Sequence, residues 1–231
     1  MPLLPGPPPV DITLRRSARA RRFSLRVSRL DGRVTLSLPP GARESEAMAF
    51  VRQQEPWIRR ALADLPLTAP VALGAVIPVE GRLLRLDAGP GRLIRVDGDS
   101  LLVPGAPAQA GVRAGAFLKH LARDRLTEAS DRYAQMIGRP YSRLTLRDTR
   151  SRWGSCTADG ALMYSWRLVM APPAVLDYVA AHEVAHLAEM NHSPAFWAVV
   201  ARLVPGYAAH RRWLKQHGQA LHGHRFGSAG D

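Results

Sequence analysis

The stretch from Tyr178 to Trp197, "YVAAHEVAHLAEMNHSPAFW", constrains the chain most, because it carries two histidines at helical spacing. His182 and His186 are four residues apart, so on a helix they lie one turn apart on the same face. Their imidazoles can therefore converge on one ion. Glu183 is rotated by about 100° from His182, which brings its carboxylate beside the open side of that ion. The H-E-x-x-H pattern predicts one Zn²⁺ ion held by the histidines, with Glu183 as a general base toward water.

A catalytic zinc usually takes a third protein ligand and a water molecule. The sequence offers His192 and Glu189 for this place. Glu189 shares the helical face of the two histidines. His192 is favoured, because a connection between two helices gives its backbone the freedom to turn back toward the ion.

The residue types around His192 predict that connection. Asn191 tolerates a positive φ and can end a helix, which we expect to stop at Met190. Ser193 is a typical N-cap and Pro194 a typical first helical residue, so a second helix is expected through Val204. Two other interpretations of the cluster are incidental histidines on an ordinary helix and a closed structural zinc site, which usually has four protein ligands.

Composition indicates a globular protein with one large or two small domains. The 231 residues are 46% hydrophobic and 22% charged, and no apolar run approaches the ~18 residues of a membrane span. The prolines of the first ten residues argue against a signal peptide. A single cysteine, Cys156, fits a reducing compartment. We therefore expect a cytoplasmic protein without membrane association.

The formal charge of +13 has two interpretations. The first is a solvated basic surface, rich in arginine by composition. The second is attraction to nucleic acid, since basic surfaces gather phosphate without reading sequence. The segment from Leu14 to Arg29 supports the second interpretation, because it carries seven arginines and no acidic residue. No aromatic ladder accompanies them.

The first half of the chain is predicted to be a small, mainly β unit over residues 11–103, after a proline-rich and disordered lead-in over residues 1–10. Alternating apolar residues on both sides of Asp31-Gly32 predict a β-hairpin. A helix is expected over residues 44–65, with a break near Pro56. Short strands follow at 71–77, 82–87, 92–96 and 100–103. Residues 104–111 have the composition of a linker.

The second half is predicted to be a domain over residues 104–220, followed by a flexible tail over residues 221–231. A long amphipathic helix is expected over residues 112–137, ended by Gly138. Strands are expected at 142–148, 151–157 and 161–168. Pro172-Pro173 then opens the helix of the histidine cluster. The predicted fold class is α+β.

These motifs resemble the YgjP-like zinc metallopeptidases, which are related to the SprT-like proteases. The resemblance covers most of residues 141–216, and it is carried by Arg152-Trp153-Gly154-Ser155-Cys156, the H-E-x-x-H, and Asn191-His192-Ser193 followed by Phe196-Trp197. It implies a zincin-like α/β domain with zinc on His182, His186 and His192 and Glu183 as catalytic base. Ser165 departs from the asparagine usual in the family, which affects a hydrogen bond near the strand.

The expected function is zinc-dependent hydrolysis of peptide bonds in a protein or peptide substrate, by metal-activated water. Arg152 and Trp153 either line the cleft on a strand that pairs with the substrate or serve packing. Tyr207 and His210 are candidates to polarise the substrate carbonyl, and no spacing argument selects either. Two alternatives differ in class: a nucleic-acid-associated protein with a structural metal, and a zinc-binding interaction module without turnover.

Overall fold

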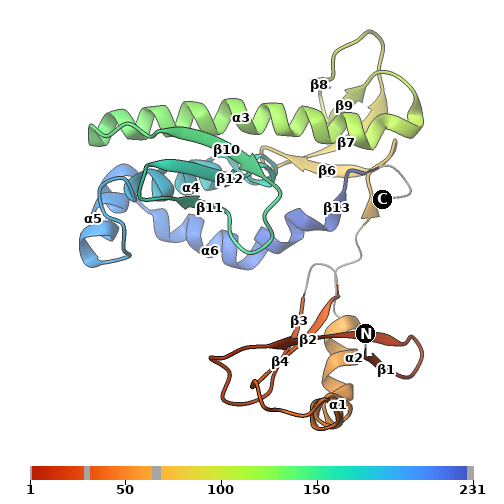
Figure 1. Cartoon of the computed structure of the whole chain (residues 1–231). Helices are drawn as coiled ribbons and strands as arrows, with labels where there is room; N and C mark the ends of the chain where they lie inside the picture. Colours follow the sequence, from red (N-terminus) through yellow and green to blue (C-terminus); the bar gives the residue numbers. More distant parts are fainter. Residues whose placement is uncertain (1, 29–31, 64–68, 228–231) are drawn as a thin grey trace. The chain divides into compact units, whose positions relative to one another are not determined.

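The computed structural model describes residues 2–28, 32–63 and 69–227 of a mixed α+β chain (Figure 1). The chain divides into two compact units, Met1–Leu67 and Thr68–Asp231. The predicted division after residue 103 therefore differs from the observed one. The reason is that strands within residues 76–103 share one hydrophobic core with the long helix that follows them.

The first unit is a four-stranded sheet with two helices. The strand order is β1 (Leu3–Leu4), β2 (Val10–Arg16), β4 (Val34–Leu38) and β3 (Ser24–Val27), and the helices are α1 (Glu44–Gln53) and α2 (Glu55–Ala63). The predicted hairpin is confirmed by the antiparallel pairing of β3 with β4. Its turn residue Asp31 lies outside the described residues, whereas Gly32 has a φ of 68°. The helix breaks at Gln54, two residues before Pro56.

The prediction of a disordered lead-in over residues 1–10 is contradicted at its apolar residues. β1 pairs antiparallel with β2, and the side chain of Leu4 is fully buried. Burial of an aliphatic side chain of this size contributes about 1.5–3 kcal/mol, which favours ordering despite the surrounding prolines.

The second unit begins with a second four-stranded sheet. Its order is β6 (Val76–Val79), β7 (Arg82–Ala88), β9 (Ser100–Val103) and β8 (Arg95–Asp97). Residues 107–109 of the predicted linker form a 3₁₀ turn that leads directly into α3 (Ala110–Ile137). Helix α3 runs the length of this unit (Figure 1) and ends, as predicted, at Gly138 with a φ of 66°. Among the described residues, no helix combines the length and the apolar character that crossing a membrane requires.

A three-stranded sheet and three helices follow α3 in this unit. The strand order is β10 (Arg143–Arg147), β12 (Ala161–Ser165) and β11 (Gly154–Cys156), so that β11 is an edge strand. A 3₁₀ segment η2 (Trp166–Met170) leads to α4 (Pro173–Ala185), α5 (Pro194–Leu203) and α6 (Tyr207–His217). Helix α4 contacts α3, α5, α6 and β11, and it is buried on nearly all sides.

The prediction of a flexible tail from residue 221 is contradicted up to residue 227. A 3₁₀ segment η3 (Gly218–Gly223) leads to β13 (His224–Arg225), which pairs in parallel with β5 (Ala69–Pro70). The buried guanidinium of Arg167 donates to the carbonyl oxygens of Leu221 at 2.9 Å and His224 at 3.0 Å, and it also pairs with Asp148. These bonds fix the C-terminal segment to the core. Residues 228–231 lie outside the described residues.

Candidate metal centre

The helix that carries the first two histidines ends earlier than predicted. Helix α4 stops at Ala185, and His186 is its C-cap residue, whereas the sequence predicts an end at Met190. The backbone then tightens, because Leu187 N–H donates to the carbonyl of Val184 at 2.9 Å, three residues back. Such bonds commonly satisfy the free carbonyls of a helix end.

The connection to the next helix places His192 as the sequence predicts, by a different backbone route. Asn191 is not among the non-glycine residues with positive φ, so the left-handed termination expected there is wrong. The N-cap is confirmed, because the Ser193 hydroxyl accepts a hydrogen bond from Phe196 N–H at 3.3 Å. Pro194 is the first residue of α5.

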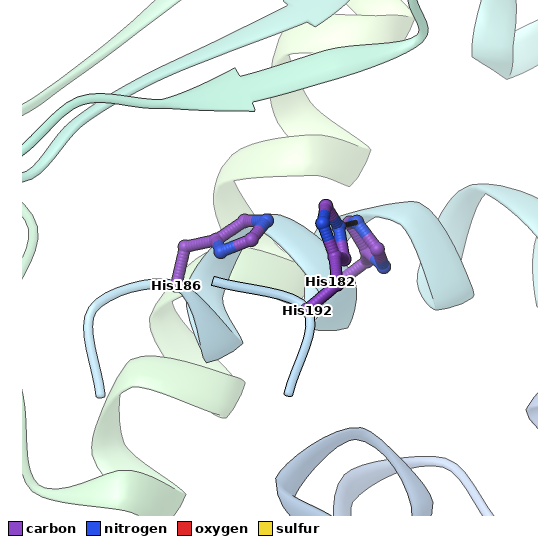
Figure 2. Close-up of side chains that lie close together, drawn as sticks. All are labelled: His182, His186 and His192. Atoms are coloured by element: carbon purple, nitrogen blue, oxygen red, sulfur yellow. Dashed lines mark hydrogen bonds between the residues drawn. The ribbon is translucent and has the colours of Figure 1, made fainter. Parts of the chain in front are cut away.

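The three histidine side chains gather in one place (Figure 2). The ligand nitrogens of His182, His186 and His192 all lie within 4.8 Å of one another. Nε2 of His182 and Nε2 of His192 are 3.1 Å apart. His186 Nδ1 lies 3.1 Å from the backbone oxygen of Glu189. Since that oxygen can only accept, Nδ1 carries the proton and Nε2 keeps a free lone pair.

The three histidines are compatible with a bound metal ion, and one separation can be compared with the geometry of tetrahedral zinc. Zn–N bonds of ~2.0–2.1 Å at tetrahedral angles place two ligand nitrogens ~3.3–3.4 Å apart, close to the observed separation of the two Nε2 atoms. Nδ1 of His182 is buried and has no hydrogen-bond partner among the described residues. Glu189 contacts the cluster through its backbone oxygen. The structure thus brings together the three favoured residues and gives the rival Glu189 a different contact.

The surroundings favour the neutral form of His182 and His186. Burial, together with the neighbouring His186 and His192, lowers the pKa of His182 to about 3. Burial also lowers the pKa of His186. The ring of Phe196 lies 4.4 Å from the ring of His186, 4.9 Å from that of His182 and 4.8 Å from that of His192, measured between centroids. Neutral imidazoles are the form that binds metal.

Glu183 lies on α4 beside the cluster, and its side chain is only 6% exposed. Burial, partly offset by the Arg152 guanidinium, raises the pKa of its carboxyl to about 8. The backbone of β11 passes directly against it: a Cβ added at Gly154 would lie 2.5 Å from both Cγ and Oε1 of Glu183. The contact of Gly154 with Glu183 is not predictable from the sequence, because a close approach between two elements leaves no local signal; only the family motif marks this glycine.

A cavity of about 370 Å³ opens beside Glu183. Its lining includes Arg152 and Trp153, so both face the cleft, and Trp153 also stacks on His222 with ring centroids 5.1 Å apart. Two further cations on α6, Arg211 and Lys215, line the cavity, and the sequence reasoning missed both. No helix was predicted for this segment, and four-residue spacing indicates a shared face only once the segment is known to be helical.

The two candidates for polarising the carbonyl are not part of this lining. The ring of Tyr207 stacks between those of Trp197, at 5.3 Å, and Tyr178, at 6.2 Å. The ring of His210 lies 6.5 Å from that of Tyr178. The Ser165 hydroxyl, where the family pattern is broken, is buried and has no hydrogen-bond partner among the described residues.

The chain matches the sequence model of one known protein family. The model of the YgjP-like metallopeptidase domain matches residues 21–217. The crystal structure of the metallopeptidase zymogen of Pyrococcus abyssi abylysin is similar at 17% identity, covering 39% of this chain and 93% of that chain. Its TM-score of 0.36 is too low to argue from. No curated protein matches the chain.

Proposed function

Because the chain belongs to the YgjP-like metallopeptidase family, and is thus a peptidase acting on proteins or peptides, we propose that it is a zinc-dependent endopeptidase with Glu183 as general base. His182, His186 and His192 would hold the ion. Zinc, when bound, supplies Lewis acidity and lowers the pKa of water to about 7. The observation that carries the proposal is the convergence of the three histidine nitrogens within 4.8 Å, next to a buried glutamate.

The environment of Glu183 supports its role in proton transfer. A carboxylate accepts a proton most effectively when its pKa is near the working pH, and burial raises the pKa of Glu183 to about 8. The close β11 backbone at Gly154 restricts where the carboxylate can lie. Glu183 would take a proton from the attacking water and later deliver it to the amine that leaves the cleaved peptide bond.

The edge strand β11 supports a peptide as substrate. It pairs with β12 on one side, and the sheet ends at its other side. An extended peptide can add to such an edge through main-chain hydrogen bonds. Because Gly154 is the first residue of β11 and lies against Glu183, a peptide paired there would pass close to the proposed base.

The match to a peptidase domain gives no support to the nucleic-acid alternative, and the zinc-module alternative requires an active site closed to substrate. The cavity beside Glu183 argues against a zinc-binding module with a closed site.

The proposed function is tested with the Glu183→Gln variant, which keeps the size of the side chain and removes the base. We expect it to keep zinc and to hydrolyse an unfolded protein such as casein at least ~100-fold more slowly, as general-base catalysis contributes ~10²–10⁴-fold. Full activity with bound zinc would refute the mechanism.

A further inference from the structure

The cavity beside Glu183 combines apolar walls with a group of cations. The walls include Trp153, Tyr178, Val179 and Leu214. Three cations complete the lining: Arg152, Arg211 and Lys215. The only carboxylate among the lining residues is Glu183 itself. With a volume of about 370 Å³, the cavity is large enough for one side chain or one chain terminus of a bound peptide.

The cations reach the cavity from two separate elements. Arg152 lies two residues before β11, whereas Arg211 and Lys215 lie one turn apart on α6. All three side chains are exposed, and none forms an ion pair within the described part of the chain. The guanidinium of Arg211 lies over the ring of Trp197, 4.8 Å from its centroid, which holds it in place. Their positive charge is therefore available to a ligand.

We propose that this cavity selects peptides that place a carboxylate in it, either from an aspartate or glutamate side chain or from the free C-terminus. The inference rests on the proposed peptidase function and names its substrate class. Arginine binds carboxylate through two parallel N–H···O bonds, and lysine adds a compact point charge. The three cations also offset the repulsion between a substrate carboxylate and Glu183.

The net charge of the protein provides the competing explanation. A charge of +13 attracts any acidic peptide at low salt, with no role for particular residues. Attraction of this kind does not depend on which single cation is removed. It also does not distinguish an acidic residue at one peptide position from the same residue at another. The experiment therefore varies both the cations and the position of the carboxylate.

The binding experiment uses the full chain with zinc and the Glu183→Gln substitution, so that peptides are bound and not consumed. The probes are dansyl-labelled octapeptides of alanine and glycine, with one Glu, Gln or Lys placed at each position in turn and the C-terminus free or amidated. At 0.15 M salt we expect Glu at one position, or the free C-terminus, to improve Kd about tenfold over Gln or the amide, which corresponds to about 1.4 kcal/mol. The peptides with Glu at different positions test a side-chain carboxylate, and the comparison of free with amidated peptides tests the C-terminal carboxylate.

Substitutions on α6 test whether the preference for Glu arises in this cavity. Lys215→Gln is expected to reduce the preference for Glu severalfold, and Lys215→Glu to shift it toward the Lys peptides. Arg212→Gln is the matched control, since Arg212 is an exposed cation of α6 outside the cavity lining. It should leave the preference unchanged. A preference that is equal at all positions, or that survives Lys215→Glu, would overturn the inference.

The binding experiment distinguishes a failure of this inference from a failure of the proposed peptidase function. Binding is measured on a variant without the base and so does not depend on cleavage. A preference in Kd that depends on Lys215 therefore supports the inference, even if the wild type cleaves no peptide. Absence of cleavage by the wild type would refute the peptidase proposal alone. Conversely, a wild type that binds and cleaves Gln and Glu peptides equally would refute the inference and leave the peptidase proposal intact.

Discussion

Gly154 and Glu183 approach each other so closely that no side chain fits between them. A Cβ at Gly154 would lie 2.5 Å from Oε1 of Glu183 and 2.7 Å from its Cδ, both distances that atoms not bonded to each other do not adopt. The contact joins the edge strand β11 to helix α4. It makes the glycine a positioning residue for the proposed base.

The Gly154→Ala variant should lose activity and keep its metal. Because the added methyl group has to displace either the Glu183 side chain or the strand, we expect kcat to fall about 100-fold, the effect of a misplacement of ~1 Å in an active site. Zinc content should stay at the wild-type value, because the three histidines are not displaced. Steady-state kinetics on a fluorogenic peptide, with elemental analysis of the same sample, measures both.

Ser155→Ala is the matched control, as Ser155 is the next residue of the same strand. It should keep kcat within about twofold of wild type, because the substitution removes only a hydroxyl group and adds no atom that could displace Glu183. Equal activity of Gly154→Ala and Ser155→Ala would show that the contact with Glu183 does not position the base.

Substitution of Arg167 is expected to destabilise the second unit more than most single substitutions there. It binds both oxygens of Asp148, at 2.7 and 3.0 Å, and the carbonyls of the C-terminal segment. Breaking a fully buried pair costs about 3–5 kcal/mol, and the partial exposure of Asp148 reduces this to about 2–3 kcal/mol for Arg167→Gln. Urea unfolding measures this loss.

Arg147→Gln provides the comparison, since this exposed cation has no ion-pair partner within the described ranges. Its effect should stay within about 0.5 kcal/mol. If both variants unfolded at the same urea concentration, the C-terminal segment would not depend on the Arg167 bonds.

His222 should make stability depend on pH. Burial and the nearby Arg167 lower its pKa to about 4, from the ordinary value of 6.5. Between these values the unfolded chain binds more protons than the folded chain, so stability is lost as the pH falls from about 6.5 toward 4. His222→Gln should therefore reduce the loss of unfolding free energy between pH 7 and pH 5, compared with wild type. Parallel pH profiles for the two proteins would contradict the neutral state of this half-buried histidine.

The features that depend on local sequence patterns were largely predictable. Helix α3 and its end at Gly138 follow from apolar spacing and from a glycine that tolerates positive φ. The gathering of His182, His186 and His192 follows from four-residue spacing and from the Ser193-Pro194 helix start. Their roles as ligands, the zincin-like architecture and the cytoplasmic location stay predictions.

Long-range contacts account for what the sequence reasoning missed. The C-terminal segment is predicted to be flexible, because its partners Arg167 and β5 are far away in sequence. Leu4 is buried by contacts that a proline-rich composition does not reveal. The boundary after residue 103 failed for the same reason, since the β6–β9 sheet shares its core with α3.

The most direct test of the account is the zinc content of the purified protein, measured by elemental analysis on wild type, His192→Ala and Glu189→Ala. A site of three histidines predicts about one zinc per chain in wild type and in Glu189→Ala, and far less in His192→Ala. Glu189 is the matched control because its backbone oxygen, which the substitution retains, makes its contact with His186. Zinc absent from wild type, or equal in His192→Ala, would contradict the proposed metal centre.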